Sequence, residues 1–249
     1  MLRKFALIML LPLCFCCRKH SSTPGIPVVK PPYGKMIASV AYYTDSTLDN
    51  TKYYTYDAYN RVAHSSGTNG DSTSYSYSGN TLVAATWGSG VYGQKITYTL
   101  TNGRITSYYG GTDPNQVSSG GSYTYDEAGY LVSGSTFQLS HSSQSGTYSY
   151  VSGNCVSIIY TAVMQIPYSY CYQYGNAANS LGNANYGMTF FGKDNANLPT
   201  SAVFIFNNND TTFTQYTYDF ATDSTVLKRR LAITHGTTSI SRTEMYTYR

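Results

Sequence analysis

A short unit recurs along the chain: two tyrosines separated by one residue, then a turn, then an apolar run. Tyr54-Thr55-Tyr56 and Tyr123-Thr124-Tyr125 begin its two fullest copies. Residues two apart point to the same face of a β-strand, so both tyrosines of a pair share one face. The unit therefore predicts a β-hairpin that carries an aromatic face.

The turn residues support this interpretation. Asp57 and Asn60, like Asp126 and Gly129, occupy the first and fourth positions favoured in a type I turn. Asn102-Gly103 is typical of a tight two-residue hairpin. Looser copies of the unit begin at Tyr75 and Tyr148, surround Ile96-Thr97-Tyr98, and return at Tyr216 and Tyr246.

Short connections force neighbouring strands to run antiparallel, and one hairpin cannot bury its own face, so the copies must stack. We expect an all-β fold in residues 34–249, a single domain. It would be an antiparallel β-meander of about 14–16 strands, forming a curved sheet or a partial or closed barrel.

Residues 175–200 interrupt the repeat with a stretch rich in Asn, Ala and Gly. We expect a loop there, with one short helical turn around 177–181. Long loops in compact domains are often functional. Two interpretations remain open at this point: a functional loop, or a cover for an open end or edge of the sheet.

The first 16 residues have the form of a signal peptide, with Arg3 and Lys4 before an apolar run. The run is too short for a membrane-spanning helix, which needs about 20 apolar residues. Residues 17–33 contain four prolines and are typical of an extended tether.

The end of this leader resembles the lipobox of bacterial lipoproteins, in which the chain is cut before a cysteine that then carries lipid. The resemblance implies lipidation of Cys17, with Cys16 and Cys14 as alternatives, and attachment to a membrane through the lipid. A plain signal peptide with cysteines as apolar filler is the other interpretation.

Composition agrees with β structure and argues against nucleic-acid binding. The chain has 28 Tyr, 9 Phe, 1 Trp and 22 Gly, and only 11% of its residues are charged. Tyr, Thr and Gly in this proportion are typical of strands and turns. Lys228-Arg229-Arg230 is the one basic run after the leader, and three charges in a row are more typical of a solvated strand face.

No motif in the sequence indicates an enzyme, a metal site or a cofactor. The four histidines, His20, His64, His141 and His235, are far apart and lie in no Cys/His cluster. Nucleophile-elbow, zinc-protease, P-loop and EF-hand patterns do not occur. Two carboxylates that meet only in space would still allow a hydrolase, so that alternative remains beside a non-enzymatic role.

Cys155 and Cys171 lie on what the pattern predicts to be adjacent strands. A hairpin centred near Val163 would place them opposite each other, and an oxidising envelope compartment favours a disulfide. The alternative is two free thiols that behave as small apolar side chains.

The tyrosines form the predicted ligand face. A row of Tyr offers flat apolar surface with a hydroxyl at its rim, which suits stacking on sugars or on a peptide; cross-strand pairs that only hold the sheet together are the alternative. The candidate ligand residues are Tyr54, Tyr56, Tyr75, Tyr77, Trp87, Tyr123 and Tyr125.

The copies at 54–62 and 123–132 resemble YD repeats, the Tyr-Asp hairpins of Rhs-type and teneurin-type shells. The whole layout, including Gly192-Lys193 and the following Asn197-Leu198-Pro199, is similar to uncharacterised lipoproteins of Bacteroidota. The resemblance implies a location in the cell envelope, as an outer-membrane lipoprotein that faces the periplasm or the surface. It implies no activity.

Three hypotheses for function follow. The first is a non-enzymatic envelope lipoprotein that binds a glycan or an envelope protein, or acts as a scaffold, through its Tyr-rich sheet. The second is a relative of YD-repeat shells that encloses cargo or mediates contact between cells. The third is a secreted hydrolase. A pocket with two close acids favours the third, a closed shell the second, and an open aromatic face the first.

Overall fold

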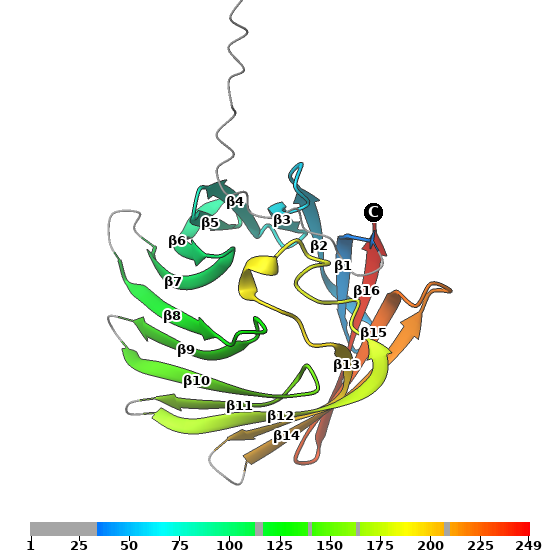
Figure 1. Cartoon of the computed structure of the whole chain (residues 1–249). Coiled ribbons are helices and arrows are strands. Elements are labelled where there is room, and N and C mark those ends of the chain that lie inside the picture. The colour runs from blue at the N-terminus through cyan, green and yellow to red at the C-terminus, as the bar shows by residue number, and fades with distance from the viewer. Residues whose placement is uncertain (1–33, 113–116, 139–140, 163–164, 207–209) are drawn as a thin grey trace, which may run out of the picture.

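The chain forms a closed antiparallel β-barrel (Figure 1). A computed structural model describes residues 34–112, 117–138, 141–162, 165–206 and 210–249. Consecutive strands pair throughout, and the first strand pairs with the last. The strands are β1 (Ile37–Thr44), β2 (Thr47–Tyr56), β3 (Val62–Gly67), β4 (Ser72–Ser78), β5 (Thr81–Gly88), β6 (Val91–Thr101), β7 (Arg104–Gly111), β8 (Ser119–Tyr125), β9 (Leu131–Gln138), β10 (His141–Val151), β11 (Asn154–Ala162), β12 (Gln165–Ala178), β13 (Asn197–Phe206), β14 (Asp210–Phe220), β15 (Val226–His235) and β16 (Thr238–Tyr248).

The predicted all-β meander is therefore confirmed, and of the predicted arrangements the closed barrel is the one formed. The predicted signal peptide (1–16), the lipidated Cys17 and the tether (17–33) lie outside the described residues. Within the described part of the chain, no helix has the length and hydropathy to cross a membrane.

The wall of the barrel has two chemically different faces. In β4, Tyr75 and Tyr77 pack toward the core inside the barrel, and the alternating Ser74 and Ser76 point outward. Pairing carries this division around the wall, because directly opposite residues share a face. Serine and threonine dominate the outer face, with pairs such as Thr99–Ser107, Ser122–Ser135 and Ser149–Ser157.

The predicted hairpin turns are present. The Asn60 N–H donates to the Asp57 carbonyl at 3.1 Å, and the Asp57 carboxylate accepts the N–H groups of Tyr59 and Arg61, each at 2.9 Å. Asp126 makes the corresponding bonds with the N–H groups of Gly129 and Tyr130. Asn102 and Gly103 both have positive φ (52° and 77°), as a tight type I′ turn requires.

The second tyrosine of the repeat unit joins neighbouring strands at one end of the barrel. Its hydroxyl donates to a backbone carbonyl at or near the beginning of the preceding strand, which satisfies two polar groups in a half-buried position. The bonds run from Tyr56 to Ile37 (2.5 Å), Tyr77 to Val62 (2.9 Å), Tyr174 to Cys155 (2.7 Å), Tyr218 to Pro199 (2.8 Å) and Tyr248 to Val226 (2.6 Å).

The segment between β12 and β13, residues 179–196, lies inside this same end of the barrel (Figure 1). We call it the plug. Barrels of 16 strands are wide enough to leave an open lumen, so side chains of the wall alone do not fill them. The one helical element of the plug is the 3-10 turn η2 (Thr189–Phe191), so the helical turn predicted around 177–181 is wrong; residues up to 178 continue β12.

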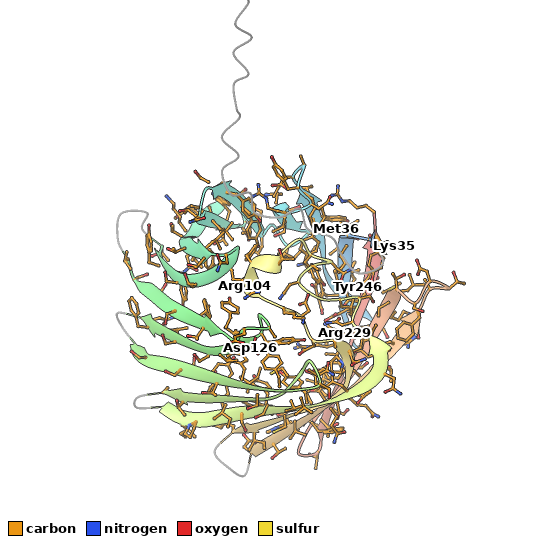
Figure 2. The ribbon with its side chains drawn as sticks, in the orientation of Figure 1. Lys35, Met36, Arg104, Asp126, Arg229 and Tyr246 are labelled. Atoms are coloured by element: carbon orange, nitrogen blue, oxygen red, sulfur yellow. The ribbon has the colours of Figure 1, made fainter. Side chains whose placement is uncertain are left out.

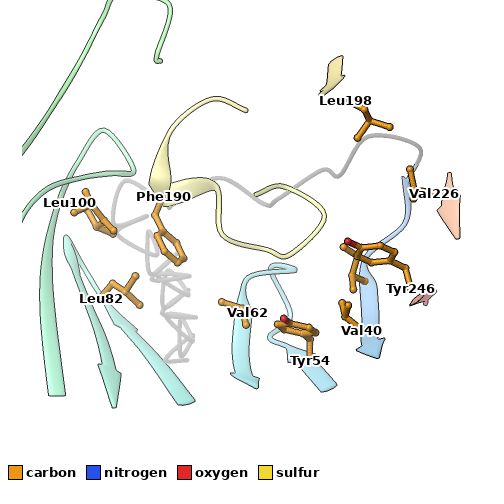
Figure 3. Packing of buried hydrophobic residues seen from close by; sticks show 11 residues of the cluster. Val40, Tyr54, Val62, Leu82, Leu100, Phe190, Leu198, Val226 and Tyr246 are labelled. Atoms are coloured by element: carbon orange, nitrogen blue, oxygen red, sulfur yellow. The ribbon is translucent and has the colours of Figure 1, made fainter. Parts of the chain in front are cut away.

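The buried core forms where the plug meets the wall (Figure 3). Phe190 of η2 is 5% exposed, and its ring lies 6.4 Å from that of Tyr77. The other buried apolar residues of this cluster come from the wall or its edges: Ile37, Val40, Tyr54, Val62, Leu82, Leu100, Ile105, Leu198, Val226 and Tyr246. The plug lies at one end of the barrel, as a cover for an open end would, and this position leaves the other interpretation of residues 175–200, a functional loop, open.

Candidate functional site

Backbone hydrogen bonds fix the plug to the wall around the barrel. The Ile37 N–H donates to the Asn185 carbonyl at 2.9 Å, and the Val62 N–H donates to the Gly187 carbonyl at 3.1 Å. On the other side, the Lys193 N–H donates to the Gly129 carbonyl at 2.9 Å. The plug is thus bonded to β1, to β3 and to the turn between β8 and β9. Among the described residues, the chain crosses the barrel only here.

A charged pair lies on the wall beside the plug. Arg229 of β15 and Glu244 of β16 are directly opposite on the inner face, with 2.6 Å between Nη2 and Oε2, and the Tyr246 hydroxyl donates to the same carboxylate. Tyr186 of the plug packs edge-on against Tyr54, with 5.2 Å between ring centroids. Figure 2 shows Arg229 and Tyr246 beside the plug.

Beyond the plug, the inner wall carries a band of tyrosines. We use the name tyrosine girdle for the first tyrosine of the unit on successive even-numbered strands: Tyr75, Tyr98, Tyr123, Tyr148, Tyr172 and Tyr216. Tyrosines of the intervening strands join the rings together. Tyr108 lies 5.9 Å from Tyr98 and is stacked on Tyr123 at 5.8 Å, and Tyr160 lies 6.4 Å from Tyr148.

Glycines opposite Tyr123 of the girdle, and opposite Tyr108 and Tyr160 beside it, let these rings lie against the sheet. A Cβ on Gly134 would come within 3.0 Å of the Tyr123 ring, and one on Gly146 within 3.0 Å of the Tyr160 ring. A Cβ on Gly121 would meet the Tyr108 ring at 2.6 Å. These rings therefore lie close against the backbone on the lumen side of the wall, and β7–β11 carry a set of neighbouring aromatic rings that we call the platforms.

Burial keeps the girdle hydroxyls protonated. It raises the pKa of Tyr123 to about 12, with the neighbouring Tyr108 adding to the shift. The pKa values of Tyr75, Tyr98 and Tyr148 are also raised, in each case chiefly by burial. At neutral pH these side chains are uncharged, so each hydroxyl can donate as well as accept a hydrogen bond.

A pocket of about 330 Å³ lies between the plug and the wall of β9–β11. We call it the floor pocket. Its volume is at the lower end of the range of about 300–1,000 Å³ for small-molecule sites. The wall contributes Leu131, Tyr148, Tyr150, Cys155 and Ile158, and the plug contributes Asn183, Phe191, Lys193, Asp194 and Asn195.

Polar groups of the floor pocket are held in place by hydrogen bonds within the plug and to the wall. The Asp194 carboxylate accepts the N–H groups of Asn183 (2.7 Å) and Ala184 (3.2 Å), while burial raises its pKa above the ordinary value. The Asn195 side-chain oxygen accepts the Cys155 N–H at 2.7 Å. Phe191, by contrast, is 39% exposed although its side chain is large and apolar. The pocket thus combines aromatic faces with fixed amides and a carboxylate.

The predicted ligand residues do not form one face. Tyr75 and Tyr123 belong to the girdle and face the lumen, whereas Tyr54 is buried under the plug. Tyr56 and Tyr77 use their hydroxyls to join strands, and Tyr125 lies against the guanidinium of Arg104, 5.8 Å from ring centre to Cζ. Trp87 stands apart, opposite Ser72 on the outer face, with its ring 6.1 Å from that of Tyr92.

Cys155 and Cys171 are free, so the disulfide considered from the sequence does not form. Cys171 is exposed on the outer face opposite Ser157, not opposite Cys155. Two features separate the cysteines. The register of β11 and β12 places Ser157 opposite Cys171. In addition, β11 has a bulge: Ser149 pairs with Ser157 but Tyr150 pairs with Cys155, so Val156 is the extra residue. The bulge turns Cys155 inward, where burial raises the pKa of its thiol.

Carboxylates in the lumen are engaged in structural contacts. Asp194 holds two backbone N–H groups of the plug, and Glu244 is paired with Arg229. The floor pocket has one acid among its lining residues. No group of three or more His, Cys, Asp or Glu side chains suited to a metal ion occurs in the part of the chain that the structure describes.

Sequence reasoning did not identify the plug residues of the floor pocket as ligand candidates. Lys193, Asp194 and Asn195 lie in the segment that carries the resemblance to Bacteroidota lipoproteins, which was the available signal. Phe191 lies just before that segment, and its only signal was its place in the loop of residues 175–200. Tyr148 was visible as a looser copy of the repeat.

No protein-family model matches the chain, and no curated protein is detectably similar to it in sequence. Solved structures with the same fold include two porin-like proteins. A porin-like protein from Bacteroides uniformis is similar with a TM-score of 0.64 and 16% identity, over 89% of this chain and 100% of that one. A porin-like protein from Bacteroides vulgatus has a TM-score of 0.58 and 13% identity, over 86% and 99%. At these identities the likeness concerns the fold alone, and the resemblances to lipoproteins and to YD repeats stay predictions.

Proposed function

We propose that the protein is a non-enzymatic binding module of the cell envelope, and that its tyrosine-lined lumen binds a glycan. The observation that carries this proposal is the set of closely spaced tyrosine rings on the inner wall of the barrel, packed against cross-strand glycines. Flat apolar rings bordered by hydroxyls match the alternating apolar faces and hydroxyl edges of sugar rings.

The direction of the tyrosines favours a glycan over a folded protein partner. The girdle lies on the inner face of a closed barrel, where only a narrow or extended molecule can reach it. A folded envelope protein would meet the outer face, on which serine and threonine dominate. Of the roles in the first hypothesis from the sequence, which were binding of a glycan, binding of an envelope protein and a scaffold role, we therefore propose glycan binding.

The outer face also bears on location. A barrel embedded in a membrane carries an apolar band outside and polar residues inside, and this wall has the opposite arrangement. We propose that the barrel stands in water and is held at the membrane by lipid on Cys17, as an envelope lipoprotein. Two porin-like neighbours from Bacteroides support the barrel fold on which this argument depends.

Closure of the barrel supports a second candidate, the shell that encloses cargo. In this chain the described lumen holds a segment of the chain itself, the plug, at one end. A shell predicts that a bound guest copurifies and stays through dialysis, whereas a glycan-binding module exchanges its ligand. Native mass spectrometry of the purified protein separates the two.

A thermal-shift screen tests the glycan proposal. The chain from residue 34 holds the whole barrel, and it would be screened against polysaccharides, oligosaccharides and peptidoglycan fragments. A ligand that binds only the folded state raises the melting temperature by an amount set by its concentration over its dissociation constant. A saturable shift that is lost in Tyr123→Ala but kept in Tyr109→Ala supports the proposal. Tyr109 is the matched control because it is 50% exposed on the outer face, opposite Thr97. No shift across the panel would refute it.

A further inference from the structure

We infer that the barrel binds its glycan by one end, with the terminal sugar in the floor pocket and the following sugars on the tyrosine girdle. This inference rests on the proposed function and adds the mode of recognition to it. It depends on three features: a lumen closed at one end, a pocket on the floor of that lumen, and aromatic platforms beside the pocket.

The plug makes the lumen blind at the end where it lies. Its backbone is bonded to Ile37, Val62, Gly129 and Gly153, which belong to well-separated parts of the wall. A polymer threaded through the barrel would have to break several of these bonds at once. A chain that enters along the girdle therefore ends at the plug, and the part that reaches the plug is a chain terminus.

The floor pocket has the size and the chemistry for one terminal sugar ring. Phe191 exposes its ring although apolar side chains of that size are usually buried, and Tyr148 and Tyr150 face it from the wall. Beside these rings lie the side chains of Asn183, Asn195 and Asp194. Aromatic faces with a few fixed polar groups are the usual composition of a small-molecule site.

Tyr148 joins the floor pocket to the platforms. Tyr148 lines the floor pocket and also belongs to the girdle, where its hydroxyl lies 3.3 Å from that of Tyr160. Tyr160 is in turn stacked on Tyr168 with 4.7 Å between ring centroids. A sugar in the pocket would thus be followed by a cluster of tyrosine rings on β10–β12 that the next units can contact.

Oligosaccharides of one series, blocked at one end or the other, test the inference. The series is the one that gives the largest thermal shift among malto-, cello-, xylo- and chito-oligosaccharides of two to eight units. Calorimetry would compare each free oligosaccharide with the same molecule carrying a bulky aromatic tag at the reducing end or a substituent on the non-reducing sugar. We expect one of the two blocked forms to lose at least tenfold in affinity and the other to bind as the free sugar does.

Variants locate the terminal sugar. Phe191→Ala should weaken binding of short and long chains by the same factor, about fivefold or more. Tyr160→Ala should weaken long chains more than disaccharides. Phe213→Ala is the control, because Phe213 is 43% exposed on the outer face opposite Val203. Circular dichroism would establish that each variant is folded before its affinity is compared.

The outcomes separate the two proposals. If both blocked forms bind as well as the free sugar, the end-on mode is wrong while glycan binding stands. The same holds if Phe191→Ala leaves affinity unchanged for every length. If no oligosaccharide binds the unmodified protein, the proposed function fails, and the end-on mode fails with it.

Discussion

Replacing Phe190 by alanine should release the plug without unfolding the barrel. Phe190 is 5% exposed and lies between the rings of Tyr77 (6.4 Å) and Phe191 (4.8 Å). Removing a buried Phe side chain typically costs about 3–5 kcal/mol, which includes the cavity left behind. The strand ladder does not depend on the plug, because consecutive strands pair with each other and β1 pairs with β16. The cost should therefore appear as local opening.

Hydrogen exchange measures that opening amide by amide. At about 1.4 kcal/mol per factor of ten, a loss of about 3–5 kcal/mol accelerates exchange by roughly 10²–10³·⁵-fold if exchange proceeds through plug opening. The reporters are the N–H groups of Met188, bonded to the Asn183 carbonyl at 2.8 Å, and of Lys193, bonded to Gly129. Ladder amides of β10 and β11 should keep their protection.

Two results would refute this reasoning. Unchanged exchange at Met188 and Lys193 would mean that Phe190 does not hold the plug. Equal acceleration at plug and ladder amides would mean that plug and wall unfold as one unit. Phe213→Ala, which removes the same side chain from the outer face, should change neither set by more than a few-fold.

Three further predictions concern the turns, the platforms and the thiols. Burial alone would raise the pKa of Asp57, but hydrogen bonds from Arg61 and from the Tyr59 N–H hold that pKa below its ordinary value. The ionised Asp57 therefore contributes its full stabilisation above about pH 4, and this contribution is lost as the pH falls further. The difference between the urea midpoints at pH 7 and pH 3 should be smaller for Asp57→Asn than for the unmodified protein. Gly121→Ala places a Cβ 2.1 Å from the Ser135 carbonyl oxygen and should lower the melting temperature by about 2–12 °C. The control is Gly88→Ala, whose Cβ meets only the Asp71 side chain at 3.3 Å, and it should have little effect. Equal shifts of the melting temperature in the two variants would contradict the argument. In the chain from residue 34, Cys171 should react with a thiol reagent in the folded protein and Cys155 only after unfolding, whereas a peptide linked through both cysteines would show that they do pair.

The repeat made the strands and their order predictable because its signals are local. Tyr54 and Tyr56 show which residues share one face of the strand, and Asp57 and Asn60 show where the turn lies. After a short turn the next strand must pair antiparallel with the one before it. Closure of the barrel had no such signal. It depends on the pairing of Ile37 with Tyr248 and of Val40 with Tyr246, residues at opposite ends of the domain.

The site was only partly predictable for a related reason. The alternation of a strand shows that Tyr75 and Tyr77 share a face, but it does not show that the face is the inside of a barrel. One extra residue, Val156, was enough to turn Cys155 to the other face from Cys171. Pairing registers and bulges of this kind depend on contacts across strands, which a local pattern does not contain.

The seam between β1 and β16 also means that the strand order is circular. Met36 and Arg249 exchange backbone hydrogen bonds in both directions, at 3.0 and 3.4 Å, so the two ends of the barrel segment are already neighbours. A gene that joins residue 249 to residue 34 through a short linker, and opens the chain at the Asn102-Gly103 turn, would encode the same sixteen strand pairings. In this way the new chain ends could be placed at any of the short turns. A protein attached to a chain end could then be moved from the end of the barrel that holds the plug to the opposite end.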